Sequence, residues 1–400
     1  MSPVFKTMKS RPYKKALLLL LFSVLVLWGI GQWVTLSSSA RQTEAKETDP
    51  DALKKAKIED SKRQFRLSER RSDDRASPLP SLLTLYDENQ FQAVSDQIVG
   101  LSEQKKNAAV HLLHGNALVF LGKHEEAVAA YQQAFRQAES PQEQAAAMSN
   151  FGLLFTIKGV WKEGIHWIER ALTIDRQTGN RRAEGADLAL LGTLYYQAGD
   201  TAKGSEAHIE ALKIAESISD RRLMARQLAS IGNLHYLDHS YDTALDYQQK
   251  ALKLYRELEN PIGEAVSLTS LSFIHKDRKD FTKALAYQSD ALAIHEKGKD
   301  LSAQANDLIN LALIHQDQGE LEKAIGSAEK ALKIREGMGD TTGMANVEGT
   351  IGTIHQSFGN LPQAIQHLEK SKELFQKGGA SQQIHIVDQR IQTLRDQMHN

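Results

Sequence analysis

Apolar and small residues recur with a period of forty along most of the chain. Rows of forty residues that begin at Phe151 align without a gap as far as Arg390. Every row opens with an apolar residue that is usually followed by a small one, at Phe151-Gly152, Leu191-Gly192, Ile231-Gly232, Leu271-Ser272, Leu311-Ala312 and Ile351-Gly352. Thirteen positions later comes another small residue, at Gly164, Gly204, Ala244, Ala284, Ala324 and Ala364. A period of this length indicates a repeat architecture in which each row is one structural unit.

Each row contains two predicted helices, because apolar residues recur within it at intervals of three and four. Glycines predict the turn between the first and the second helix, at Gly159, Gly199, Gly319 and Gly359. Asn and Asp residues predict the N-cap of the following first helix, at Asn180, Asp220, Asn260, Asp300 and Asp340. No segment alternates apolar and polar residues over a useful length, so the sequence predicts an all-α fold.

These rows resemble the tetratricopeptide repeat (TPR), whose signature places a Leu-Gly-x2-Tyr run before small residues at fixed offsets. Leu191-Gly192-x2-Tyr195 is a close copy, and Gly199, Gly204 and Ala211 follow it. The forty-residue period is similar to a lengthened subgroup of the family, found in spindle-orientation adaptors and Rap-type bacterial regulators. Two features depart from the family: aliphatic residues such as Leu228 replace the first Trp, and the usual Pro near the end of the second helix is missing. HEAT repeats, which share a period of about 40, are the alternative.

The resemblance implies a right-handed α-solenoid of about eight helix-turn-helix repeats, because a single unit cannot bury its apolar faces alone. We place the repeat array at 80–380. A C-terminal capping helix is predicted at 381–400, where one face carries Ile384, Val387, Ile391, Leu394 and Met398.

The N-terminal region has a different pattern. Residues 1–15 carry five Lys or Arg and no acid, and residues 16–36 are almost entirely apolar, long enough for a transmembrane signal-anchor helix. The cationic segment should stay in the cytoplasm, which places the repeat domain in the periplasm or outside the cell. A cleaved signal peptide ending near Ala40 is the alternative.

Residues 37–79 mix charges of both signs with few aromatic side chains, so we interpret them as a solvated stalk that cannot fold alone. Ile58 and Phe65 leave room for a loose helix there.

Composition and motifs narrow the classes of function. A formal net charge of −1 gives no basic surface for nucleic acid, and zero cysteines exclude disulfides, zinc knuckles and thiol catalysis. The chain contains no glycine-rich phosphate loop and none of the common hydrolase or metalloprotease motifs. We therefore expect a protein that is not an enzyme, with no catalytic residues, cofactor or metal.

Four histidines recur as a ladder at one register position in successive rows, at His235, His275, His315 and His355. Histidine is a common metal ligand, so we considered whether these four could form a metal site. Equivalent positions on stacked helices lie about 8 to 10 Å apart, whereas a zinc–nitrogen bond is about 2.1 Å long. Tyr195 holds the same position in another row. We interpret the ladder as packing residues that cannot share one ion.

Taken with the resemblance, these features predict a membrane-anchored scaffold that binds a partner protein or peptide in its concave groove, with self-association left open. The family's geometry implies that polar first-helix positions line this groove and are free of the core. Carried onto this sequence, they are Asn116, Tyr196, Arg226, Asn233, Tyr236, Lys276, Asn306, Gln316, Asn346 and Gln356. A Rap-like regulator of a signalling protein is the alternative function.

Overall fold

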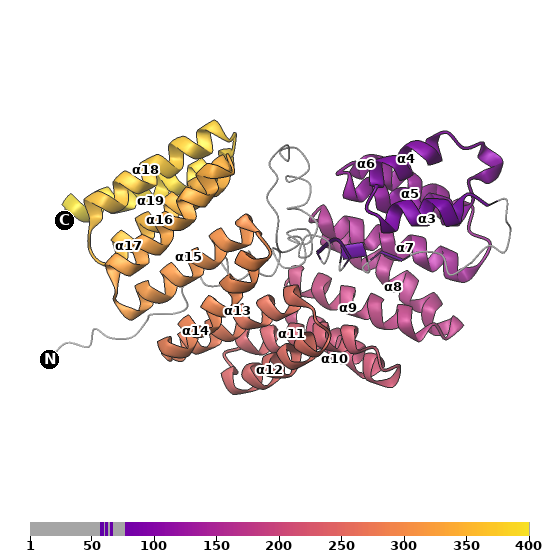
Figure 1. Ribbon diagram of the computed structural model, residues 1–400, viewed down its shortest axis with the longest axis horizontal. Helices are drawn as coiled ribbons and strands as arrows, with labels where there is room; N and C mark the ends of the chain where they lie inside the picture. The colour runs from indigo at the N-terminus through magenta and orange to yellow at the C-terminus, as the bar shows by residue number, and fades with distance from the viewer. Residues whose placement is uncertain (1–56, 60, 63–64, 67–76, 400) are drawn as a thin grey trace. The chain divides into compact units, whose positions relative to one another are not determined.

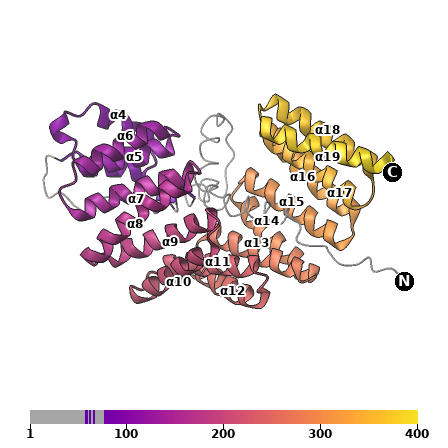
Figure 2. The same cartoon turned by 180° about the vertical axis from the view of Figure 1, so that it is seen from behind.

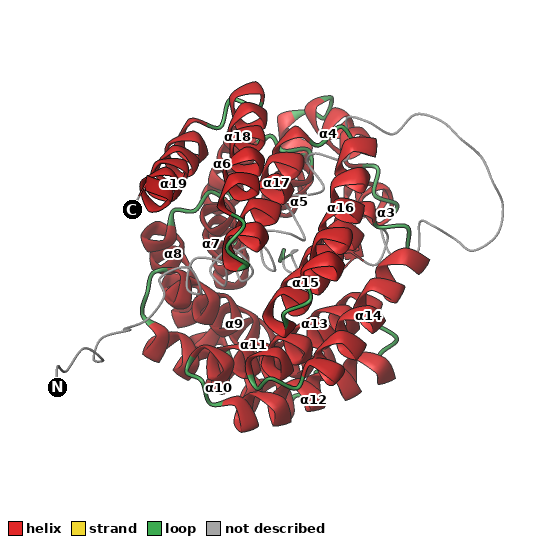
Figure 3. Cartoon of the chain, turned by 90° about the vertical axis from the view of Figure 1, so that its left-hand side faces the viewer, coloured by secondary structure: helices red, strands yellow, loops and turns green. Residues whose placement is uncertain are grey.

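The computed structural model describes residues 57–59, 61–62, 65–66 and 77–399. All regular structure in these residues is helical, and Figure 3 shows helices joined by short loops. The prediction of an all-α repeat fold is therefore confirmed. The predicted membrane helix at 16–36 and the cleavage site near Ala40 lie outside the described residues. Among the helices that are described, none is both long and apolar enough to cross a membrane.

Between Leu79 and His399, the helices form eight successive pairs and one further C-terminal helix (Figure 1). The first helices of the pairs are α3 (Leu79–Asp87), α5 (Ala108–Phe120), α7 (Pro141–Ile157), α9 (Arg181–Gln197), α11 (Arg221–Leu237), α13 (Pro261–Asp277), α15 (Leu301–Gln318) and α17 (Thr341–Ser357). The second helices are α4 (Phe91–Val99), α6 (His124–Arg136), α8 (Trp161–Thr178), α10 (Thr201–Ser217), α12 (Tyr241–Glu257), α14 (Phe281–Lys297), α16 (Leu321–Gly337) and α18 (Leu361–Lys377). A 3₁₀ turn, η1 (Glu103–Lys105), precedes α5, and α19 (Ser381–His399) packs on α18 in the predicted capping segment.

The predicted N-caps are confirmed. In each case the side-chain oxygen accepts a hydrogen bond from the backbone N–H three residues later, which satisfies a donor left open at the start of a helix. The pairs are Asn180 with Ala183, Asp220 with Leu223, Asn260 with Gly263, Asp300 with Ala303 and Asp340 with Gly343.

The connectors between helices share one backbone feature. From Gly159 to Gly379 a residue with positive φ recurs every twenty positions, once after each helix. The predicted turn glycines are among them, with φ of 72° at Gly159, 90° at Gly199, 86° at Gly319 and 78° at Gly359. The five middle positions carry ordinary side chains, at Ser219, His239, Glu259, Lys279 and Lys299. Left-handed backbone at a residue with a Cβ is strained, so the repeat geometry overrides local preference there.

The sequence predicts one continuous array, whereas contacts divide the described chain into two compact units at residues 57–227 and 228–399. Within each unit a helix packs mainly on its sequence neighbours (Figure 2). Because each repeat contacts mainly its neighbours, an array can form two compact units although the sequence repeat continues across the boundary.

The two cores differ in composition. Unit 1 contains large aromatic side chains, and the rings of Phe91 and Phe120 stack with centroids 4.5 Å apart. The small-residue columns are fully buried in both units, at Ala171 and Ala211 in unit 1 and at Ala244, Ala251, Ala284, Ala291, Ala324, Ala331 and Ala364 in unit 2. Alanine at these positions lets the helix backbones approach closely.

The interpretation of residues 37–79 as a solvated stalk is wrong for the described residues between 57 and 66. Ile58 and Phe65 are each only 5% exposed and belong to the core of unit 1. The ring of Phe65 lies 5.4 Å from that of Phe120. The prediction failed because the segment is mostly charged, although its two apolar side chains pack against the repeat domain. We call the described residues 57–59, 61, 62, 65 and 66 the insert.

Candidate functional site

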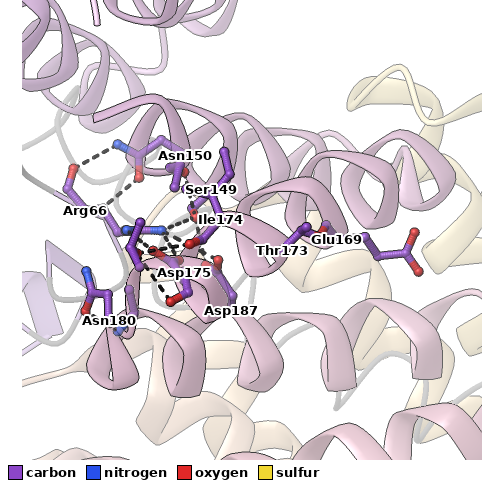
Figure 4. A network of polar contacts seen from close by, with 12 residues as sticks. Arg66, Ser149, Asn150, Glu169, Thr173, Ile174, Asp175, Asn180 and Asp187 are labelled. Atoms are coloured by element: carbon purple, nitrogen blue, oxygen red, sulfur yellow. Dashed lines mark hydrogen bonds and ion pairs between the residues drawn. The ribbon is translucent and has the colours of Figure 1, made fainter. Parts of the chain in front are cut away.

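The insert brings a guanidinium group into unit 1 from outside the repeats, as Figure 4 shows. The Nη1 and Nη2 atoms of Arg66 donate to the two carboxylate oxygens of Asp175, at 2.7 Å and 3.0 Å. Nη1 also donates to Ser149 Oγ at 2.8 Å and lies 3.5 Å from Asp187 Oδ2. Two parallel bonds to one carboxylate fit the planar fork of arginine and not the ammonium of lysine.

The backbone of residue 66 is held as well as its side chain. Asn150 Oδ1 accepts from the backbone N–H of Arg66 at 2.9 Å, and Asn150 Nδ2 donates to the carbonyl of the same residue at 3.0 Å. Asn116 Nδ2 lies 3.4 Å from that carbonyl. One side-chain amide therefore pairs with both polar groups of a backbone unit, in a way that does not depend on the bound side chain.

Consecutive helices position these groups. Ser149 and Asn150 lie on α7, Asp175 on α8 and Asp187 on α9, and α8 packs against both first helices. Asn116, on α5, has its orientation fixed because its Oδ1 accepts from the Tyr131 hydroxyl and from Asn150 Nδ2, both at 2.9 Å.

Further contacts hold the insert against α3 and α5. Lys62 Nζ donates to the carbonyl of Asp87, at the C-terminal end of α3, at 2.9 Å. The same ammonium lies 5.2 Å from the ring centre of Tyr86. A cation is favoured there both by the negative end of the helix dipole and by the aromatic face.

The electrostatics of the site require a cation. Asp175 is fully buried and Asp187 is 2% exposed, and a buried carboxylate is costly unless it is paired. Burial raises the pKa of Asp187 well above its usual value, the charge of Arg66 opposes this shift, and the neighbouring Asp175 adds to it. Ser149 Oγ donates to Asp187 Oδ1 at 2.7 Å. Two buried carboxyl groups thus share one guanidinium.

Of the ten predicted groove residues, Asn116 lies in this site. The expectation that the set is free of the core is wrong for Asn116, Tyr196 and Tyr236, which are 0%, 7% and 9% exposed. Tyr236 illustrates the reason: its hydroxyl donates to Asp277 Oδ2 at 3.0 Å, so its polar end is satisfied while its ring is buried. Arg226 and Gln316 are half-buried, and Asn346 is exposed.

The remaining predicted groove residues bond to neighbouring side chains of unit 2. Asn233 Oδ1 accepts from Gln248 and Ser270, Lys276 pairs with Asp317, Asn306 Oδ1 accepts from Arg335, and Gln356 Oε1 accepts from Arg390. Their role in binding a partner stays a prediction.

The histidine ladder packs within rows. Ring stacks join His235 to Tyr247, His275 to Tyr287 and His355 to His367, with centroids 5.4 to 5.6 Å apart. His315 Nδ1 instead lies 2.8 Å from Glu320 Oε2. Each contact joins a histidine to a residue of its own row, which supports the interpretation of the ladder as packing residues.

Sequence reasoning missed Arg66, Ser149, Asn150, Asp175 and Asp187. A signal was present in the register. The positions forty residues apart from Asp175 hold Ala215, Tyr255, His295, Arg335 and Phe375, so an acid stands in a column that is otherwise mixed and largely buried. The structure buries this column, and an acid in a buried column needs a compensating cation from elsewhere in the chain.

Comparison with known families agrees with this architecture. Family models described as tetratricopeptide repeats match residues 108–141 and, in three overlapping segments, residues 223–297, 263–337 and 301–377. The chain carries tetratricopeptide repeats. The match decides against HEAT repeats for these residues. No curated protein matches the sequence significantly.

Several solved structures have a similar fold. The apo form of RapI shares 16% identity over 68% of this chain and 99% of its own, with a TM-score of 0.56. A signal transduction ATPase with a TPR sensor from Pyrococcus horikoshii shares 15% identity over 76% of this chain, with a TM-score of 0.60, but only 47% of that protein is covered. The quorum sensor NprR of B. thuringiensis, in complex with its cognate peptide NprX, gives 15% identity, coverage of 80% and 98%, and a TM-score of 0.52. At these identities the similarity shows the fold alone.

Proposed function

We propose that the repeat domain binds a partner protein or peptide on the side formed by its first helices, and that the chain serves as a non-enzymatic scaffold. The observation that carries this proposal is the pairing of Asn150 with both backbone groups of residue 66. A side-chain amide aimed at main-chain N–H and C=O groups is suited to capturing a peptide of any sequence.

The comparisons give this proposal independent support. NprR, which has the same fold, has been solved with its cognate peptide bound. The forty-residue spacing of helix starts, from Arg181 through Arg221, Pro261, Leu301 and Thr341, further supports assignment to the lengthened TPR subgroup.

The test uses Asn150→Ala, with Asn310→Ala as the matched control. Asn310 lies in unit 2 at the same register position and is also buried, at 9% exposure. Partners are cross-linked in cells and recovered with each variant. We expect recovery to fall about tenfold for Asn150→Ala, because a backbone clamp is lost, and to stay unchanged for Asn310→Ala. Full recovery by an Asn150→Ala chain with native circular dichroism would contradict the proposal.

We also propose that residues 16–36 anchor the chain in a membrane, on the strength of their length, their apolarity and the preceding positive charges. A reporter fused after Asn400 should then be active only on the side of the membrane opposite residues 1–15. Reporter activity in the cytoplasm would contradict this topology. An N-terminal sequence beginning at Arg41 would establish cleavage instead.

A regulator of a signalling protein is the second candidate. It is favoured by the shared fold with a signal transduction ATPase and with a quorum sensor. This function needs the repeat domain in the cytoplasm, so protease treatment of spheroplasts separates the two candidates. Digestion of the repeat domain from outside favours the scaffold, and protection favours the regulator.

A further inference from the structure

We propose that the insert is an internal ligand: Arg66 occupies, within its own chain, a site that takes an arginine-bearing segment of the partner, and the partner must displace it. The inference rests on the proposed function and deepens it, because it names the chemistry that the site selects. It also assigns the insert a role in controlling access to that site.

The first argument is that the site is a complete recognition site for one residue type. Asp175 receives two parallel hydrogen bonds from the guanidinium, and Ser149 receives a third. Asn150 binds the backbone of the same residue. The site thus recognises both a guanidinium group and the backbone of the residue that carries it. Together these groups define an arginine within a peptide.

The second argument is that the repeats do not complete this site by themselves. At the same two register positions in unit 2, His295 replaces the first acid and Asp307 the second. His295 Nδ1 lies 2.5 Å from Asp307 Oδ2, and Gln288 Nε2 donates to Asp307 Oδ1 at 2.8 Å. Unit 2 therefore satisfies its buried acid with its own side chains. Unit 1 carries two acids, Asp175 and Asp187, whose cation comes from outside the repeats.

The third argument is that the insert is held in the manner of a bound peptide. Residue 66 is not helical, and its backbone bonds go to side chains of unit 1. The Arg66 side chain remains 14% exposed, so the site is open to solvent on one side. A tethered ligand has an effective concentration on the order of millimolar, and a free competitor is weakened accordingly.

The experiment measures binding of a synthetic peptide with the sequence of residues 57–68, capped at both ends, to the full-length chain in detergent. Isothermal titration is run on the native chain and on Arg66→Gln. The control peptide carries Gln in place of its residue 66. Loss of the internal guanidinium leaves Asp175 without its cation and the insert more weakly held, and Asp187 can take up a proton because burial already raises its pKa.

We expect Arg66→Gln to bind the native-sequence peptide at least about tenfold more tightly than the unaltered chain does, and to bind the control peptide no better than the unaltered chain. Adding Asp175→Asn to Arg66→Gln should abolish binding. Equal binding by the native chain and the variant, or equal binding of the two peptides, would overturn the proposal.

A second variant covers failure of Arg66→Gln to fold. Arg66→Lys keeps the positive charge but cannot reach both oxygens of Asp175, so it should fold and bind the peptide more tightly than the native chain. Absence of peptide binding to both variants would overturn the proposal that the insert is an internal ligand.

Partner recovery, measured in parallel, separates this proposal from the proposed function. Peptide binding without Asn150-dependent recovery contradicts only the proposed function, and recovery without peptide binding contradicts only the internal ligand.

Discussion

Units 1 and 2 fill the same pair of register positions in opposite ways. Unit 1 places Asp175 and Asp187 there, two buried acids joined through Arg66. Unit 2 places His295 and Asp307 there, and the imidazole and the carboxylate bond directly. The same register positions therefore hold a site that depends on an added segment in one unit and a closed polar pair in the other. Register alone does not determine function in a repeat protein, because the charge balance of each column decides what it can bind.

The largest expected effect comes from neutralising one acid in each unit. Asp175→Asn should lower the free energy of unfolding of unit 1 by about 3 kcal/mol, because it breaks a buried ion pair. Asp307→Asn should cost unit 2 only about 1 kcal/mol, since an amide oxygen can still accept from His295. Amide hydrogen exchange rates in α7 to α9 and in α14 to α15 measure the two losses of stability separately. Equal losses would remove the distinction between the units.

Acid should also affect unit 1 more than unit 2. Burial lowers the pKa of His208 to about 4 from its ordinary value of 6.5, while the hydrogen bond to Gln227 opposes the shift. The unfolded chain then binds a proton that the folded chain does not, so stability is present above pH 6.5 and falls as the pH drops from 6.5 toward 4.

For a pKa shift of this size, the loss in the free energy of unfolding approaches about 3 kcal/mol. Denaturant titrations at pH 7 and pH 4.5 should show a smaller difference for His208→Gln than for the native chain. Burial also lowers the pKa of His275 and His355 in unit 2. Tyr at both of these positions should flatten the profile less than His208→Gln does. A native pH profile in His208→Gln would contradict burial as the cause.

Close packing between helices predicts an intermediate effect. A Cβ at Gly192 would meet the ring of His208 at 2.7 Å, whereas a Cβ at Gly326 would meet nothing within 4 Å. Gly192→Ala should therefore cost about 1 to 3 kcal/mol through overpacking. Gly326→Ala should raise the free energy of unfolding by about 0.5 to 1 kcal/mol, because alanine lowers the backbone entropy of the unfolded chain. Thermal unfolding of the two variants checks the opposite signs.

The smallest effect concerns the strained connectors of the middle rows. Lys279 has φ of 67°, so Lys279→Gly should stabilise the chain by about 1 kcal/mol. Gly319 has φ of 86° and open space around it, so Gly319→Ala should destabilise by a similar amount. Shifts of the denaturation midpoint in the same direction for both variants would contradict this account.

The fold followed from the sequence because repetition supplied the same signal many times. The apolar doublets, the small-residue columns and caps such as Asn180 are local, and each row repeats them. The site did not follow, because its decisive contact joins residues 109 positions apart. Arg66 lies in a segment whose composition is that of a solvated linker. Only the burial of Asp175 and Asp187, which depends on stacking, creates the demand for a guanidinium.

The groove residues were assigned by analogy, and polar residues on a first helix proved able to satisfy one another. Asn306 and Arg335 are an example, with Arg335 Nη2 donating to Asn306 Oδ1 at 2.6 Å. A polar residue at a groove position is thus compatible with either a ligand contact or a contact inside the array. Pairing within the array can be recognised only once both partners are placed.

The left-handed residue at every twentieth position has a consequence for how the chain can change in length. The same backbone turn ends first and second helices alike, so the array is built with a single kind of joint. One residue inserted within a helix would rotate every later side chain of that helix by about 100° relative to the joint, and would turn its apolar stripe away from both neighbours. Adding or deleting forty residues at equivalent joints leaves each interface in phase. Deletion of one complete row from unit 2 is thus a milder change to this protein than deletion of one residue from the middle of α14.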